Sequence, residues 1–263
     1  MKSRQRREVE PYIILHRQDY VLLGEQVFGV PGLEAVEVVG PYSPVVASGA
    51  LITVHDARIE PHRGISHHAH RNNERIFYIM EGELDHDDAL NDIKGHLATG
   101  DAGLFTEGQR GMLHSEWNNG DTVTHAFILV YPTRPVPATT AFAILPHAEM
   151  PIAEDEGVRT IEIVGPASPM EVNGDIHLFS DSLLSKRSAL EIRLGAGEGG
   201  LIFVQSGQLR LDGAKLSLSD SVLFSPQDRE RRFVLEVLSE ARVLRVVHGE
   251  GFGLQRQWRE AAT

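Results

Sequence analysis

Short apolar runs separated by turn residues recur along most of the chain. Five of these runs are rich in branched and aromatic residues, as is typical of β-strands; they span residues 75–80, 104–106, 125–131, 201–205 and 233–238. Helical periodicity is weak, and only residues 183–190 and 255–262 are candidate helices. Many short strands at close spacing predict an all-β protein built from a sandwich or a small barrel.

This pattern occurs twice. Three sequence blocks recur in the same order: VEVVGPYSP at 36–44 with IEIVGPASP at 161–169, IFYIMEGEL at 76–84 with LIFVQSGQL at 201–209, and GDAGLF at 100–105 with SDSVLF at 219–224. The first two pairs share an offset of 125 residues, and the third has an offset of 119. Ordered blocks at nearly constant offset predict an internal duplication. We therefore expect two domains, residues 1–135 and 136–263, joined near the proline-rich segment 132–140.

Charge and hydropathy narrow the class of partner. The 263 residues include 25 Lys and Arg against 37 Asp and Glu, for a formal charge of −12. This acidic balance argues against direct binding to nucleic acid, and we assign the short basic stretch at residues 2–7 to solvent. The apolar runs fall short of the ~18 residues that span a bilayer, and residues 1–17 are charged where a signal peptide is apolar. We expect a cytoplasmic protein without a membrane partner.

Histidine is concentrated in one part of the chain. Nine of the 13 histidines lie between His55 and His125. Because histidine is the commonest metal ligand and the usual general base, this clustering predicts that the chemistry is located there. The chain has no cysteine, which excludes disulfides, thiolate metal sites and thiol nucleophiles.

Two motifs supply candidate metal ligands. HAHRNNE places His68 and His70 on one face of a strand, about 6–7 Å apart. GMLHSEWNN places His114 and Glu116 on one face in the same way. If the two strands pair inside a barrel, three nitrogen ligands and one oxygen ligand can converge on a single ion. This set suits Fe(II), Mn(II), Ni(II), Cu(II) or Zn(II), and does not choose among them.

The motifs HxHRxxE, YxxEGExxHxD, GD and HSE, in this order, resemble the first half of the pirin family of two-domain cupins, which includes pirin-like quercetin 2,3-dioxygenases. The resemblance is close over residues 60–118 and looser over most of the chain. It implies an all-β bicupin of two jelly-roll-like β-barrels in tandem: a metal-binding N-terminal cupin and a metal-free, structural C-terminal cupin. It further implies one divalent metal per chain, most characteristically Fe(II), with Mn, Ni, Cu or Zn as alternatives. The implied ligands are His68, His70, His114 and Glu116.

The sequence also departs from the family pattern. Ala69 replaces the usual proline between the two histidines, and the pair 72–73 is Asn–Asn where the family has Gly–Phe. An upstream PHRG imitates part of the motif, but the twelve-residue spacing to the EG glycine selects His70 and not His62. In the second copy, the four ligand positions align with Arg193, Gly195, Phe233 and Leu235. We therefore expect the metal in the first domain alone.

Three nearby residues have alternative interpretations. The general cupin pattern uses a glutamate at the position of Glu74 as a ligand, whereas pirin-like proteins use the equivalent of Glu116, so Glu74 is either a fourth ligand or a proton-handling group. His86 fits a polar turn better than the site. His67 is expected to be exposed, with a place at the mouth of the site as the alternative.

Two functions agree with these residues. The resemblance implies a dioxygenase acting on flavonol-like or related aromatic substrates, in which the metal is a Lewis acid and template and Glu116 or Glu74 accepts the substrate hydroxyl proton. The alternative is a non-enzymatic iron-binding regulatory or redox-sensing protein that binds a protein partner. Both uses need the same four ligands, so the sequence leaves the choice between enzyme and regulator open.

Overall fold

The computed structural model describes residues 11–251, and this part of the chain is almost entirely β. Its helical segments are short: α1 at Glu25–Phe28 and single 3-10 turns at Arg17–Asp19 and His147–Glu149. Within the described residues, no helix is long and apolar enough to cross a membrane. The candidate helix at 255–262 and the basic stretch at 2–7 lie outside the described residues.

The prediction of a helix at residues 183–190 is wrong. This segment contains the end of β15 (Ile176–Leu184), a turn and the start of β16 (Ala189–Leu194). Its apolar residues serve two strands that follow each other closely, and the four-residue turn between them makes the local spacing resemble a helical period.

The first half of the chain forms two facing sheets. The larger has the order β12-β9-β6-β11-β4-β3-β2, and the smaller has the order β5-β10-β7-β8. Their strands are β2 Leu22–Leu23, β3 Leu33–Val39, β4 Thr53–Ile59, β5 Arg63–His70, β6 Asn73–Glu81, β7 Glu83–Asp88, β8 Ile93–Ala98, β9 Ala102–Thr106, β10 Met112–Asn118, β11 Thr124–Pro132 and β12 Ala141–Leu145. The predicted strands at 75–80, 104–106 and 125–131 are confirmed as parts of β6, β9 and β11.

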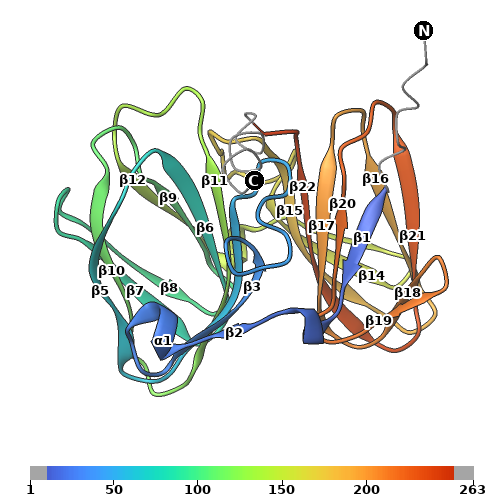
Figure 1. Ribbon diagram of the computed structural model, residues 1–263, viewed down its shortest axis with the longest axis horizontal. Helices are drawn as coiled ribbons and strands as arrows, with labels where there is room; N and C mark the ends of the chain where they lie inside the picture. The colour runs from blue at the N-terminus through green and yellow to red at the C-terminus, as the bar shows by residue number, and fades with distance from the viewer. Residues whose placement is uncertain (1–10, 252–263) are drawn as a thin grey trace, which may run out of the picture.

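The second half repeats this plan beside the first (Figure 1). Its larger sheet has the order β1-β20-β17-β22-β15-β14-β13, and its smaller sheet has the order β16-β21-β18-β19. The remaining strands are β1 Tyr12–Leu15, β13 Ile152–Asp155, β14 Val158–Val164, β17 Gly199–Ser206, β18 Leu209–Leu211, β19 Ala214–Leu216, β20 Ser221–Phe224, β21 Arg231–Val237 and β22 Ala241–His248. The predicted strands at 201–205 and 233–238 correspond to β17 and, except for its last residue, β21.

The duplicated VGPxSP block forms the same turn in both halves. Gly40 and Gly165 follow β3 and β14 with φ of 145° and 155°. A Cβ at either position would collide with the carboxylate of the preceding glutamate, Glu37 or Glu162, which binds backbone N–H groups of the turn. A bulge occurs at the same point in each strand pair. The predicted duplication is thus confirmed at the level of single hydrogen bonds.

The sheets do not divide at the predicted boundary between residues 135 and 136. β12 lies beyond that boundary but pairs with β9 of the first half, and β1 pairs with β20 of the second half. Figure 1 shows β1, in blue, beside the orange and red strands. Each half therefore receives an edge strand from the other side of the boundary. The added strands pair with backbone groups that would otherwise lie exposed at the edge of each sheet. A local sequence pattern does not predict such pairings, because the paired strands are far apart in the sequence.

The largest hydrophobic core lies between the two halves. It packs Tyr78 and Phe127 of the first half against Phe179 and Phe203 of the second, and the rings of Phe127 and Phe203 are 5.3 Å apart between centroids. Each half also has its own core between its two sheets. Since burial of one such side chain stabilises by about 1.5–3 kcal/mol, apolar contact holds the halves together.

Candidate metal centre

The strands that carry the predicted ligands are neighbours. β5 and β10 pair antiparallel, with His114 directly opposite His68. The register shifts between His114 and Glu116, so that Glu116 faces Ile65 across the pair. Residues two apart on a strand share a face, and His70 therefore lies on the same side as His68. The predicted pairing is confirmed, and it brings three imidazoles and one carboxylate to one place inside the first barrel.

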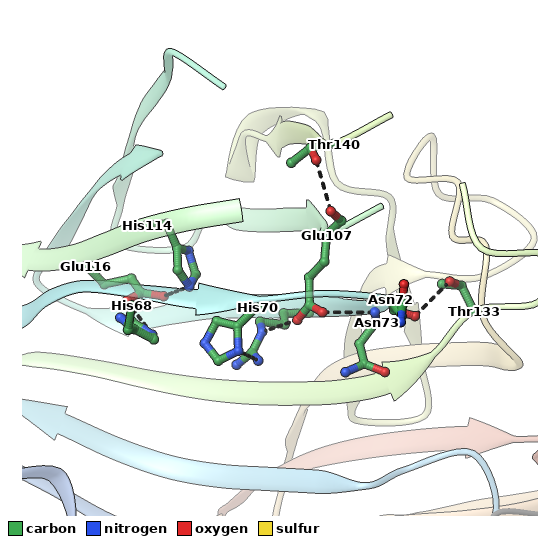
Figure 2. Close-up of polar contacts among 10 residues, drawn as sticks. His68, His70, Asn72, Asn73, Glu107, His114, Glu116, Thr133 and Thr140 are labelled. Atoms are coloured by element: carbon green, nitrogen blue, oxygen red, sulfur yellow. Dashed lines mark hydrogen bonds and ion pairs between the residues drawn. The ribbon is translucent and has the colours of Figure 1, made fainter. Parts of the chain in front are cut away.

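The four side chains are within reach of a single ion. The ligand atoms of His68, His70 and His114 lie within 4.8 Å of one another. Glu116 Oε1 is 3.2 Å from Nε2 of His114, and its Oε2 is 3.7 Å from Nε2 of His68 (Figure 2). His114 and Glu116 are buried, while the side chain of His68 is 32% exposed. The site therefore opens toward solvent on the side of His68.

Several potential metal-ligand atoms of these four side chains are buried without a hydrogen-bond partner. They are Nε2 of His70, both ring nitrogens of His114 and Oε2 of Glu116. Buried polar atoms in native proteins are nearly always hydrogen-bonded, so a converging set of unbonded ones requires an explanation. A cation would satisfy them, and imidazole with carboxylate is a ligand set that first-row divalent metals accept. The residues present fit a metal ion.

Backbone contact prepares His68 as a ligand. Its Nδ1 lies 2.9 Å from the carbonyl oxygen of Ser66. Because a carbonyl can only accept, Nδ1 carries the proton and the lone pair is on Nε2, the nitrogen that faces Glu116. Such an outer hydrogen bond fixes the tautomer and the ring orientation of a metal-binding histidine.

Burial sets the protonation of the group. It lowers the pKa of His70 to about 3 and lowers the pKa values of His68 and His114 as well, with the Arg75 charge adding to each effect. Burial also raises the pKa of Glu116 to about 7. The three histidines are therefore neutral at neutral pH, which is the form that binds metal, and Glu116 can gain or lose a proton there.

Arg75 and Glu107 are part of the site, and the sequence interpretation missed both. Nη2 of Arg75 is 2.6 Å from Nδ1 of His70, and Nε of Arg75 donates to Oε1 of Glu107 at 2.7 Å. Glu107 is fully buried. Alternation along β6 places Arg75 on the same face as Phe77 and Ile79 of the first barrel's core, but both faces of this strand carry apolar residues, so the sequence pattern did not single out Arg75.

The interpretation of His86 as part of a polar turn is wrong. His86 is on β7, where Leu84, His86 and Asp88 alternate inward, and its side chain is buried. Its ring lies 5.2 Å from that of His114 between centroids and 4.7 Å from that of Phe105. Burial lowers its pKa to about 4, and neither ring nitrogen has a hydrogen-bond partner. His86 thus packs as a neutral aromatic ring beside the candidate ligands.

Glu74 does not lie with the candidate ligands. Its carboxylate accepts hydrogen bonds from the hydroxyl of Thr106 and from Asn173 of the second half. On β6, Glu74 shares a face with Ile76 and Tyr78, which pack into the core between the halves. The expectation of a ligand or proton-handling role for Glu74 is corrected accordingly, because its side chain points away from the barrel interior.

His62 and His67 lie outside the candidate metal centre. His62 is in the loop before β5, and His67 is on β5 itself. His62 is exposed. His67 is also exposed and points to the outer face of the sheet, where its Nε2 is 3.9 Å from Asp87. It therefore does not line the mouth of the site. On that outer face, Glu83, Asp85 and His96 form a second, more exposed group of close metal-type side chains.

The aligned positions of the second half face different surroundings. Leu235 belongs to an apolar cluster that fills the second barrel, and Phe233 packs against it. Arg193 is exposed and pairs with Glu191, at 2.8 Å. Gly195 donates its backbone N–H to Glu198.

The connector between the halves is held against the site strands. Thr133 donates to the carbonyl oxygen of Asn72 at 3.2 Å, and Thr140 donates to that of Glu107 at 2.9 Å (Figure 2). From Thr140 the chain enters β12, whose Phe142 packs on Phe105 and on His86. Residues 133 and 140 of the connector are thus tied to the two ends of the segment that carries Arg75 and Glu107.

Comparison with known proteins gives a consistent result. The Pirin family model matches residues 35–130, which include all four candidate ligands. A quercetin 2,3-dioxygenase of Escherichia coli is 26% identical over 179 residues, covering 66% of this chain and 72% of that protein. A pirin-like protein of Caulobacter vibrioides is 34% identical over 79 residues, which span 30% of this chain and a third of that protein (33%).

A solved structure has the same fold over most of the chain. The crystal structure of a bacterial pirin from Escherichia coli in complex with nickel(II) superimposes with a TM-score of 0.75 at 18% identity, covering 90% of this chain and 99% of that one. This likeness confirms the predicted all-β bicupin fold of two cupin domains in tandem.

Proposed function

Residues 35–130 belong to the pirin family, and on this basis we propose that the chain is a metal-dependent bicupin that binds one divalent metal in its first barrel. The ligands that we assign are His68, His70, His114 and Glu116. The observation that carries the proposal is the convergence of their buried ligand atoms, several of which have no hydrogen-bond partner.

The ligand chemistry narrows the metal to the first-row divalent ions. Three imidazoles and a carboxylate suit Fe(II), Mn(II), Ni(II), Cu(II) and Zn(II). We propose Fe(II), on the resemblance to the pirin family; the E. coli pirin that shares the fold is described with nickel(II).

We further propose that the site supports a dioxygenase reaction on flavonol-like or related aromatic substrates. The E. coli relative named quercetin 2,3-dioxygenase supports this class of reaction. When bound, the metal would supply Lewis acidity to substrate oxygens. The chain itself would supply a base, because the carboxylate of Glu116 lies beside His114 and His68 in the site and would accept a substrate hydroxyl proton. Phe105 and Phe142 would exclude water from the inner side, and the exposed edge of His68 would admit the substrate.

Metal analysis and oxygen uptake test this proposal. We expect wild-type protein to bind about one equivalent of Fe(II) and to consume oxygen with quercetin only when loaded. The His68→Ala and His114→Ala variants should lose the metal and the uptake together. His67→Ala is the matched control, because His67 is the neighbour of His68 on the opposite face. Metal retained in both ligand variants would contradict the site, and an iron-replete protein that leaves quercetin unchanged would contradict the reaction.

The burial of His114 and Glu116 favours a second candidate function. A metal held mainly by buried ligands, with aromatic rings packed beside them, also suits an iron-binding regulatory protein. In such a protein, a protein partner would bind according to the oxidation state of the metal. This candidate requires metal binding without oxygen uptake. The same experiment therefore separates it from the dioxygenase.

A further inference from the structure

Two histidines of the candidate centre are held in opposite ways. The Nδ1 of His68 faces a carbonyl oxygen of Ser66, which can only accept a hydrogen bond. The Nδ1 of His70 faces Nη2 of Arg75 at 2.6 Å. A guanidinium can only donate, so the Nδ1 of His70 must carry the lone pair. In the neutral ring the proton of His70 is then on Nε2.

This proton assignment sets His70 apart as a ligand. The Nε2 of His68 has its lone pair free and faces Glu116. The Nε2 of His70 is buried and has no acceptor for its proton. For His70 to bind a metal through Nε2, the proton must move to Nδ1, and Nδ1 would then face the N–H of Arg75. The metal and the guanidinium therefore compete for one imidazole.

Buried contacts hold Arg75 in this place. Its Nε donates to Oε1 of Glu107 at 2.7 Å, and its side chain is only 16% exposed. Glu107 is fully buried, and its Oε2 accepts the backbone N–H of Asn73 at 2.9 Å. The backbone N–H of Glu107 donates to the carbonyl oxygen of Asn73 in return. The guanidinium is thus anchored between the start of β6 and the turn after β9.

We propose that Arg75, anchored by Glu107, opposes metal loading by occupying the lone pair of His70, so that His70 becomes a ligand only when the guanidinium turns away. This inference rests on the metal site proposed above. It makes Arg75 a positioning residue that determines how tightly the centre holds its metal, and Glu107 the residue that keeps it in place.

Nickel(II) affinity, measured by competition with a chromophoric chelator, tests the proposal. The variant to measure is Arg75→Met/Glu107→Gln, which removes the competing N–H and leaves the net charge of the pair at zero, as in the wild type. We expect it to bind Ni(II) at least about tenfold more tightly, the scale on which outer contacts of metal-binding histidines act. Arg71→Met is the matched control, because Arg71 is an exposed arginine close by whose guanidinium bonds the carbonyl oxygen of Arg110, and it should bind like the wild type.

The outcomes are distinct. A folded double variant that binds Ni(II) no more tightly than the wild type would overturn the role of Arg75 while leaving the metal site intact. A wild type that binds no Ni(II) would overturn the site itself and this inference with it.

A second measurement needs no variant. Long-range ¹H–¹⁵N NMR of the metal-free wild type should show the Nδ1–H tautomer for His68 and the Nε2–H tautomer for His70. The Nδ1–H tautomer at His70 would overturn the proposal.

Discussion

Glu74 and Asn173 are joined by two hydrogen bonds across the two halves of the chain. The backbone N–H of Asn173 donates to Oε2 of Glu74 at 2.8 Å, and its side-chain Nδ2 donates to Oε1 at 2.6 Å. The hydroxyl of Thr106 donates to Oε1 as well. A fully buried carboxylate with these partners serves the contact between the barrels and has no oxygen directed toward the candidate ligands.

Glu74→Ala should therefore destabilise the protein and leave metal binding intact. The loss of hydrogen bonds to a buried charged group predicts a decrease of about 3 kcal/mol in the free energy of unfolding, measured by urea denaturation. The Ni(II) affinity of the folded variant should equal that of the wild type. A large fall in affinity with little change in stability would instead place Glu74 at the metal.

His86→Leu should preserve both the metal site and the fold. His86 packs as an aromatic ring against Phe105 and Phe142, and its two nitrogens are buried without partners. Replacing an unsatisfied buried polar group with an apolar one of similar volume is neutral or stabilising, by up to about 1 kcal/mol. Thermal unfolding and chelator competition check the two parts. Loss of the metal in this variant would identify His86 as a ligand that we have not assigned.

Gly49→Ala should weaken the contact between the halves. Gly49 has a φ of +53°, and a Cβ there would overlap the ring of His248 and lie 2.5 Å from the carbonyl oxygen of Gly249. Backbone strain and the steric clash together predict a loss of at least about 2 kcal/mol. Gly213→Ala is the control, because Gly213 also has a positive φ, +88°, but has open space around it. Equal losses in the two variants, by urea denaturation, would show that the clash with His248 adds nothing.

The free energy of unfolding should depend on pH through His248. Burial lowers its pKa to about 4, from about 6.5 in the unfolded chain. Between these values the unfolded state binds more protons than the folded state, so stability falls as the pH falls from 6.5 to 4.

His248→Asn removes this titration and keeps a donor for the carbonyl oxygen of Gly249, which Nδ1 of His248 contacts at 2.8 Å. In metal-free protein, the variant should lose less stability over this interval, by up to about 3 kcal/mol. Other titrating groups, including His70 and His86, are common to both proteins and cancel in the difference. Parallel stability curves for the two proteins would contradict the assignment.

Features that are encoded locally could be predicted from the sequence. Runs of branched and aromatic residues between turn residues predicted the strands, because strand and turn preferences depend on neighbouring residues, and the recurring sequence blocks predicted the duplication. The spacing of His68, His70, His114 and Glu116 predicted that they would share a face once their strands paired, and β5 and β10 do pair.

The direction in which the side chains of β6 point could not be predicted from the sequence, because it depends on tertiary packing. Both faces of this strand are buried, one against the second half and one inside the first barrel, so apolar residues occupy both faces and the pattern does not distinguish them. Packing of the two halves turned Glu74 toward Asn173 and Arg75 toward His70. The exchange of β1 and β12 between the halves likewise depends on contacts between residues far apart in the sequence, which local patterns do not specify.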